Sequence, residues 1–463
     1  MGRIDQRTWL AIAAIAAIGL ALRVAAAQGA LWLDEAWSAV TAQEVGTPLG
    51  VFLRINHDNN HHLNTLWLQL VGPGAPPLLQ RGLSIASGTA AAVVAGMIGA
   101  RSGRAAALCM AALFAVSPLL VTYGAEARGY APMVLALLVT VQIVGRWLED
   151  GAARTVPLAA TVLLGMFSQL TMAFALVAIA LWVAFELFFV ARPETPPWSK
   201  AAAILIPLLA PAMAAVALVL AAAGPAGLQF GSYDSFRWVA FNDGVTTMWK
   251  FAFGGLFLWL AGLFLVLVWP REKARTGKPA GELIVFGLMA LVPAGVALLQ
   301  LGNSGTPRYY LVAGIGWLAI VALRAGERIA TGGGQRVVAG IGLAAILVAS
   351  LAMDRTIVRD RRADPGMALA AMRARAPGGT DAAVDRPRSS AVLRAASASS
   401  GYRLTVIEAP CPATPFLFVD RDGDEAFPDA PERCGARYAP IAEGHPHGLS
   451  GTHWKLYQRT SAR

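Results

Sequence analysis

An acidic pair, Asp34-Glu35, stands in the segment LWLDEAWSAV, directly after the first long apolar run of the chain. Carboxylates beside an apolar surface are costly unless they are paired or used chemically. A positioned carboxylate can act as a general base, so this pair is the first candidate for catalysis. The spacing also fits a structural role, because Asp34 can open a helix that runs to Glu44 and interact with its N-terminal dipole. Both roles can hold at once.

A second polar segment, residues 56–64, holds three histidines. His57 and His61 are four residues apart with Asp58 between them, which is similar to the His-Glu-x-x-His zinc motif. The Asp in place of Glu, two poor helix-forming asparagines and the lack of a third ligand weigh against a metalloprotease. We interpret His61 and His62 as part of a polar floor that contacts a phosphate or a sugar. A solvated loop with interfacial histidines is the alternative.

Two further segments place an arginine beside tyrosines. Glu126, Arg128 and Tyr130 end one apolar run; in a helix Glu126 and Tyr130 would share a face, with Arg128 pointing elsewhere. A structural Glu–Arg salt bridge is the alternative there. Arg308 and Tyr309 begin a late apolar run. Arg308 either snorkels to the membrane surface, with its tyrosines in the interfacial belt, or binds a phosphate at headgroup depth.

These residues must be positioned by membrane helices. Of the 463 residues, 56% are apolar and 14% are charged, and the mean hydropathy is +0.55. Ordinary soluble domains carry about 25% charged residues, so a soluble multidomain enzyme is excluded, and so is a disordered chain. The net charge of +10 does not indicate nucleic-acid binding, because the basic residues sit singly or in short groups between apolar runs. The chain is a polytopic membrane protein.

Eleven apolar runs are long enough to predict membrane spans. They are approximately residues 9–27, 81–100, 105–122, 131–147, 156–173, 174–191, 201–222, 247–269, 283–301, 311–323 and 337–353. The first lacks a clear cleavage site, so we interpret it as a retained helix and not as a signal peptide. His62 to Val71 is too short to cross and predicts an interfacial or re-entrant helix.

The distribution of Lys and Arg predicts the orientation. With the N-terminus in the cytoplasm, inner loops hold fifteen of these residues and outer loops hold six, as the positive-inside rule requires. An odd number of spans then places the C-terminus outside. The polar segments described above all fall on the outer side, so we expect the chemistry at the outer face of the cytoplasmic (inner) membrane.

Two domains are expected. Residues 1–354 form the membrane module, with an outer loop at 28–80 that holds interfacial helices, and residues 355–463 form a small extracytoplasmic α/β domain. Its predicted helices are 367–376 and 389–400, and its predicted strands are 402–408, 415–419 and 453–458. Cys411 and Cys434 fall in this domain and could pair in an oxidising compartment. Cys109 lies in a span.

The order of these features resembles the GT-C superfamily of membrane glycosyltransferases, in particular the branch of the protein mannosyltransferases and the lipid A aminoarabinose transferase. An outer Asp-Glu follows the first span, Glu-Ala-Arg-x-Tyr ends the third, and Pro-Arg-Tyr-Tyr-Leu begins a late one. The resemblance covers roughly residues 9–320. It implies an all-α polytopic fold of about eleven transmembrane helices with a small extracytoplasmic α/β domain.

The resemblance also implies a reaction. A sugar would pass from a polyprenyl-phosphate donor to an envelope lipid, glycan or protein, with inversion at the anomeric carbon, and Asp34 would be the general base. Glu35 would orient the site or the acceptor. Arg128 and Arg308 would stabilise the leaving phosphate, with His61 or His62 as a third donor.

Glu126, Tyr130 and Tyr309 complete the expected substrate-binding set. Where the family often has His-Pro-Pro-Leu-Tyr-Tyr, this chain has His61-His62-Leu63-Asn64-Thr65-Leu66, so the family pattern supports the histidines less directly than Asp34. We expect no obligate metal, although some members use a divalent ion.

A glycolipid transporter or flippase is the alternative function. It would need polar groups along a path through the midplane of the membrane. The predicted spans are nearly free of charge, with Arg23 and Glu186 as the main exceptions, and the chain has no internal repeat of the kind found in many transporters. An enzyme that resembles an O-antigen ligase or polymerase is a further alternative within the wider family.

Overall fold

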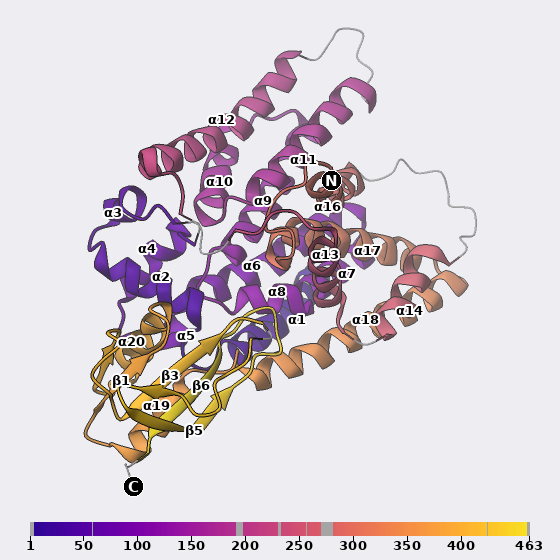
Figure 1. Cartoon of the computed structure of the whole chain (residues 1–463). Helices are drawn as coiled ribbons and strands as arrows, with labels where there is room; N and C mark the ends of the chain where they lie inside the picture. Colours follow the sequence, from indigo (N-terminus) through magenta and orange to yellow (C-terminus); the bar gives the residue numbers. More distant parts are fainter. Residues whose placement is uncertain are drawn as a thin grey trace.

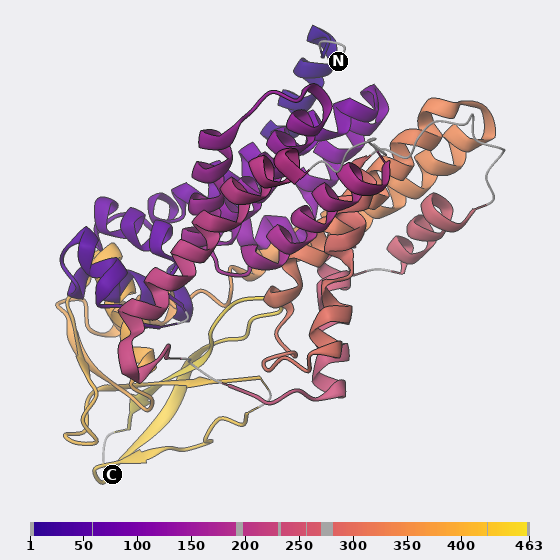
Figure 2. The same ribbon diagram turned by 90° about the horizontal axis from the view of Figure 1, so that it is seen from above.

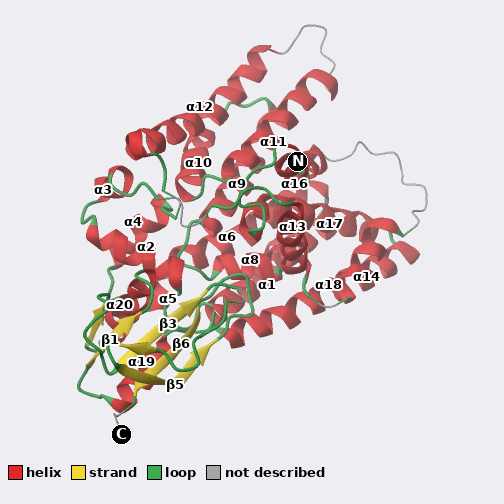
Figure 3. Ribbon diagram, in the orientation of Figure 1, coloured by secondary structure: helices red, strands yellow, loops and turns green. Residues whose placement is uncertain are grey.

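The computed structural model describes residues 4–57, 59–190, 198–229, 233–255, 257–269, 281–423 and 425–460. A large helical module is followed by a unit of mixed helices and strands at the C-terminus (Figures 1 and 3). The strands gather at one end of the helical module, and the N-terminus lies at the other end (Figure 2).

The helices of the membrane module carry the apolar runs of the sequence. They are α1 (Gln6–Ala26), α6 (Gly82–Gly99), α7 (Arg104–Val116), α8 (Pro118–Gly124), α9 (Tyr130–Asp150), α10 (Thr155–Ser168), α11 (Met172–Phe185), α12 (Trp198–Ala223), α13 (Trp238–Phe253), α14 (Leu258–Leu263), α15 (Gly281–Ala290), α16 (Val292–Leu298), α17 (Leu311–Thr331) and α18 (Gly333–Asp360). Four shorter helices lie between α1 and α6: α2 (Leu33–Glu44), α3 (Pro48–Leu53), α4 (His62–Val71) and α5 (Pro77–Gln80).

The number of spans differs from the prediction. Among the described residues, eight helical stretches are long and apolar enough to cross a membrane, or ten if the bent pairs α7–α8 and α13–α14 each make one span. The run predicted at 156–173 forms only the fourteen-residue α10. At 1.5 Å per residue α10 reaches about 21 Å, short of the ~30 Å of a bilayer core. All eleven predicted runs are thus helical, but α10 is shorter than the other ten.

Helix α10 nevertheless returns the chain to the level at which α9 begins. The imidazole of His61 contacts both helices at the level where α9 begins and α10 ends. Its ring lies 5.2 Å from the ring of Tyr130, the first residue of α9. Its Nδ1 lies 3.1 Å from the carbonyl oxygen of Ser168, the last residue of α10. Helix α10 thus runs back along α9 despite its length.

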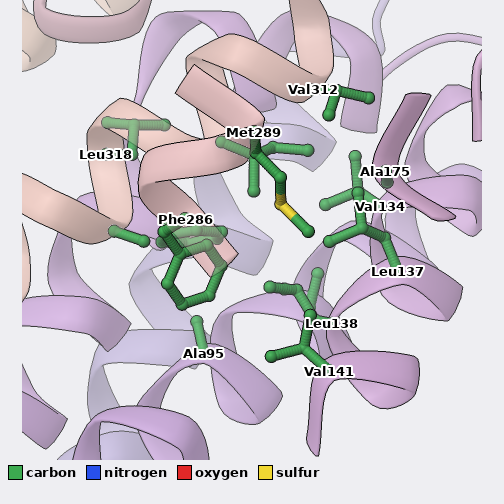
Figure 4. Packing of buried hydrophobic residues seen from close by; sticks show 14 of the residues in the cluster. Ala95, Val134, Leu137, Leu138, Val141, Ala175, Phe286, Met289, Val312 and Leu318 are labelled. Carbon is green, nitrogen blue, oxygen red and sulfur yellow. The ribbon is translucent and has the colours of Figure 1, made fainter. Parts of the chain in front are cut away.

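The centre of the helical module is packed with apolar side chains from several helices. Figure 4 shows part of this core, in which Phe286 and Met289 of α15 face side chains of α9 and α17. On the outside, large apolar residues such as Ile206 and Met213 of α12 are exposed, as expected for a surface that faces lipid. The helical module is thus apolar both in its packed core and on the surface that faces lipid.

The short helices before α6 are amphipathic. On α4, Leu68 is buried, whereas Leu70 is 78% exposed. Leu49 of α3 and Leu79 of α5 are also exposed. Exposed leucines on short helices outside the long spans fit the interfacial placement expected from the sequence.

The C-terminal unit is built on a six-stranded mixed sheet. Its elements are α19 (Gly366–Arg375), β1 (Thr380–Val384), α20 (Arg388–Ser400), β2 (Leu404–Ile407), β3 (Phe416–Arg421), β4 (Glu432–Arg433), β5 (Ala436–Gly444) and β6 (His453–Arg459). The strand order is β2-β1-β3-β6-β5-β4, with β1 parallel to both neighbours and the other pairs antiparallel. Both predicted helices and all three predicted strands are present, and β1, β4 and β5 are additional. Cys411 and Cys434 form a disulfide bond.

This unit shares a hydrophobic core with the membrane module. Ala36 and Ala39 of α2 are buried in the same cluster as Val392 and Leu393 of α20 and Trp454 of β6. Helices α2 and α20 pack directly against each other (Figure 1). The position of α2 therefore depends on both parts of the chain.

Gly326 tests the close packing of the helical module. A Cβ at Gly326 of α17 would lie 2.4 Å from the Cα of Ala106 in α7, whereas a Cβ at Gly340 of α18 would meet nothing within 4 Å. We expect Gly326→Ala to lower the free energy of unfolding by about 1–3 kcal/mol through overpacking. Gly340→Ala should leave it unchanged or raise it slightly. Thermal unfolding followed by tryptophan fluorescence compares the two variants; equal losses would contradict the packing argument.

Candidate functional site

A cavity of about 860 Å³ lies where the membrane helices meet the C-terminal unit. Such a volume is typical of ligand-binding pockets. The membrane module lines it with Asp34 and Trp37 of α2, with residues of the 55–62 segment, with Arg128, Tyr130, Arg308 and Tyr309, and with residues 169–171 between α10 and α11. The C-terminal unit lines it with Arg388, Asp422, Pro446 and residues 448–451.

The carboxylate of Asp34 joins two arginines that are far apart in the sequence. Its Oδ2 lies 3.0 Å from a guanidinium nitrogen of Arg128 and 3.2 Å from one of Arg308. Among the described residues Oδ1 has no hydrogen-bond partner. Two guanidinium groups and one carboxylate leave a net positive charge in this part of the cavity, which favours an anionic ligand.

Arg128 is held from several sides. Its guanidinium lies over the rings of Trp32 and Tyr130, at 5.6 Å and 4.9 Å from their centroids. It also donates a 2.6 Å hydrogen bond to the side-chain oxygen of Asn59. These contacts restrain the guanidinium, a planar group whose paired N–H donors suit a phosphate or a carboxylate.

Asn59 is a site residue that the sequence analysis missed. Its side-chain oxygen accepts from Arg128, and its amide nitrogen donates to the backbone oxygen of Asp34 at 3.0 Å and to Oγ of Ser38 at 3.2 Å. It therefore ties the start of α2 to Arg128. The sequence signal was present, since Asn59 belongs to the polar segment, but nothing distinguished it from its asparagine neighbours. Asp58, the middle residue of the zinc-like motif, lies outside the described residues.

Glu35 lies next to Asp34 but does not line the cavity. It is completely buried and forms a bidentate pair with Arg81, at 2.9 Å and 2.6 Å. The backbone N–H groups of Trp32 and Ala127 also donate to this carboxylate. Burial alone would raise the pKa of Glu35, but the Arg81 guanidinium outweighs burial and holds that pKa below its usual value. Within this structure Glu35 orients the start of α2.

Glu126 is also completely buried away from the cavity. Ser450 of the C-terminal unit donates a hydrogen bond to its Oε1, and Arg362 lies 3.8 Å from the same oxygen. Within the described chain its ion pair is thus with Arg362 and not with Arg128. Burial raises the pKa of Glu126, against the opposing effect of Arg362 and Arg128. Glu126 joins the α8–α9 connection to the C-terminal unit.

The two histidines differ in position. His62 lines the cavity and stacks on Phe52, with ring centroids 5.1 Å apart; burial lowers the pKa of His62 to about 4. His61 is buried behind Tyr130, and burial, followed by the charge of Arg128, lowers its pKa well below the usual value. Both imidazoles are therefore neutral at pH 7, and the arginines carry the positive charge of the site. No group of three metal-ligating side chains occurs in the described part of the chain.

Comparison with solved structures finds a similar chain in the crystal structure of the Archaeoglobus fulgidus oligosaccharyltransferase in its apo form. The TM-score is 0.45 and the sequence identity is 12%; the match covers 86% of this chain and 64% of that one. This chain thus corresponds to less than two thirds of the length of the archaeal enzyme. No protein-family model and no curated protein matches the sequence.

Glu35 and Glu126 offer a matched pair of buried carboxylates. We expect Glu35→Gln to lower the free energy of unfolding by about 3–5 kcal/mol at pH 7, because Arg81 is then left buried without its partner. Glu126→Gln should lower it by less, because the amide still accepts from Ser450 and the buried Arg362 keeps its hydrogen bonds to the carbonyl oxygens of Ala26 and Ala125. Unfolding in mixed micelles by titration with SDS measures both.

The pH dependence should differ in sign between the two carboxylates. The folded pKa of Glu35 lies below the usual 4.5, so its contribution is present above that value and is lost as the pH falls through the folded pKa. The folded pKa of Glu126 lies above 4.5, so its contribution is present below that value and is lost as the pH rises through the folded pKa. Parallel pH profiles for the two variants relative to wild type would contradict this assignment.

Proposed function

We propose that this membrane protein is a glycosyltransferase that moves a sugar from a polyprenyl-phosphate donor to an envelope lipid, glycan or protein, with inversion at the anomeric carbon. The observation that carries the proposal is the Asp34 carboxylate, which lies between the guanidinium groups of Arg128 and Arg308 in one cavity. A base and two phosphate-binding groups are the components that this reaction needs.

In the proposed step, Asp34 accepts the proton of an acceptor hydroxyl as the oxygen attacks the anomeric carbon. The bond between that carbon and the donor phosphate breaks, and the phosphate leaves with the electron pair. The lipid phosphate gains a negative charge in this step. Arg128 and Arg308 therefore bind the transition state more tightly than the substrate, which is the condition for catalysis.

The arginines also regulate the base in this scheme. Without substrate both guanidinium groups contact Oδ2 of Asp34. A bound phosphate competes for the same guanidinium hydrogens and so frees the carboxylate to accept a proton. Oδ1 has no partner among the described residues, so this oxygen can meet the acceptor hydroxyl even before the ion pairs loosen.

The apolar part of the cavity lining is consistent with a lipid-linked donor. Met166 and Leu170, at the end of α10, line the cavity together with Val219 of α12 and Leu228. These apolar side chains face the same space as the two arginines. A ligand with a charged phosphate and an isoprenoid chain satisfies both walls.

The alternative of a glycolipid transporter gains no support from Arg23, one of the two charged residues noted in the predicted spans. Arg23 of α1 is buried and donates to the carbonyl oxygens of Gly19, Phe114 and Ala115. A Cβ at Gly124 would lie 2.5 Å from its Nε, so the side chain is closely enclosed. Arg23 therefore fastens α1 to α7 and does not line the cavity.

We further propose that the cavity and the C-terminal unit face the outside of the cytoplasmic membrane. The N-terminus and the sheet lie at opposite ends of the helices (Figure 2), and the disulfide bond suits an oxidising compartment. Cys109, the third cysteine, is buried, so an introduced exposed cysteine should be labelled selectively.

Cysteine labelling tests this orientation. We expect Ser400→Cys, at the end of α20, to react with a membrane-impermeant maleimide on intact spheroplasts. Ala152→Cys, between α9 and α10, should react only after the membrane is opened. Both native residues are exposed. The reverse pattern would place the cavity in the cytoplasm and exclude a periplasmic donor site.

Replacement of Asp34 tests the reaction. With purified protein in nanodiscs and a panel of radiolabelled polyprenyl-phosphate sugars, we expect Asp34→Asn to reduce transfer about 10²–10⁴-fold, the usual contribution of a general base. Asp243→Asn, an exposed aspartate on α13 that does not line the cavity, is the control. Undiminished turnover by Asp34→Asn would remove it as the base, and lipid-linked sugar crossing the bilayer without transfer would favour a flippase.

A further inference from the structure

We infer that Thr452 of the C-terminal unit is a positioning residue for Asp34, because its side chain completes the first turn of α2. The inference rests on the proposed function only for the role of Asp34. The underlying contact joins residues 419 positions apart in the chain.

The first N–H groups of a helix have no partner within the helix and must be satisfied from outside. At the start of α2, the N–H of Trp32 donates to the side chain of Glu35. The N–H of Leu33, the first residue of α2, donates instead to Oγ1 of Thr452 at 3.1 Å. Asp34 is the next residue, so the hydroxyl of Thr452 fixes the Trp32–Leu33 peptide that directly precedes the proposed base.

Thr452 is itself held firmly. It is 3% exposed, and its backbone N–H donates to the carbonyl oxygen of Arg362 at 3.3 Å. Two residues earlier, Ser450 is bonded to Glu126. Strand β6 begins directly after Thr452. The hydroxyl that meets α2 is therefore placed by the sheet and by the membrane module together.

Asp34 is fixed from the other side by Asn59, whose amide donates to the Asp34 carbonyl oxygen at 3.0 Å. The backbone on both sides of Asp34 is thus hydrogen-bonded to other elements. Rotation of the first turn of α2 would move the carboxylate away from Arg128 and Arg308. Since misplacing a reacting group by about 1 Å can cost about 10²-fold in rate, a small movement here should affect catalysis.

Loss of the Thr452 hydroxyl should not detach the C-terminal unit. Asp364 still accepts from the N–H of Ala30 at 2.8 Å, and Arg362 still donates to the carbonyl oxygens of Ala26 and Ala125. The shared hydrophobic core between α2 and α20 also stays intact. Valine has nearly the shape of threonine, so Thr452→Val removes the hydrogen bond and leaves the packing.

Thr414 provides a matched control. It is also 3% exposed, it lies in the same unit, and its Oγ1 also accepts a backbone N–H, that of Ala383, at 3.1 Å. Thr414→Val therefore removes an equivalent hydrogen bond, together with the one that Oγ1 donates to the carbonyl oxygen of Phe416 at 2.6 Å, and neither involves α2. Thr452→Ser keeps the hydroxyl and should rescue the effect of Thr452→Val.

The experiment compares the full-length wild type with these three variants in nanodiscs. Hydrogen exchange of peptides that cover residues 30–37 reports the order of α2 without any assay of activity. We expect about tenfold faster exchange there for Thr452→Val only. In the transfer assay we expect kcat about tenfold lower with the donor KM within about twofold, and recovery in Thr452→Ser.

The outcomes separate this inference from the proposed function. Faster exchange in Thr452→Val alone, with no transfer by the wild type from any donor, would support the placement of α2 and overturn the glycosyltransferase proposal. An active wild type with unchanged exchange and kcat in Thr452→Val would overturn the inference and leave the proposed function standing. Equal effects of Thr414→Val would also overturn it, because the cause would then be general loosening of the unit.

Discussion

The buried ion pair of Glu35 and Arg81 is the interaction on which the rest of the site depends. Two fully buried charges are tolerable only when every polar atom finds a partner. Arg81 donates to the carbonyl oxygens of Ala27, Gly29 and Ala30, and Glu35 accepts from the N–H of Ala127. Glu35 adjoins Asp34, and Ala127 adjoins Arg128. The pair therefore helps to place Asp34 relative to Arg128 without entering the cavity.

The sequence was sufficient for the features that local patterns determine. Apolar runs marked the long helices, and polar segments identified Asp34, Arg128 and Arg308 before their proximity was known. Adjacency in the sequence did not show that Glu35 and Glu126 lie outside the cavity, because consecutive residues on a helix or tight turn point in different directions. Each was grouped with a cavity neighbour, yet each side chain points into the protein.

Residues whose role comes from distant partners could not be found in this way. Arg81 entered the prediction only as one of the six basic residues of the outer loops, and Asn59 was one of several asparagines. No sequence pattern near Thr452 predicts a contact with α2. Their importance arises from contacts over 46, 69 and 419 positions. Contacts between residues so far apart produce no periodic pattern in the sequence. The length of α10 was missed for another reason: its apolar run continues past Ser168, where the backbone leaves the helix.

The short α10 has a consequence for the surrounding lipid. If α10 crosses the bilayer, its length of about 21 Å in a core of ~30 Å produces hydrophobic mismatch, which is relieved by local thinning or by drawing the headgroup layer inward. The residues that follow α10 line the cavity. Under the proposed function, such thinning would bring the headgroup level close to the arginines, so that a lipid phosphate could reach them from the leaflet while its hydrocarbon chain stayed among the other lipids.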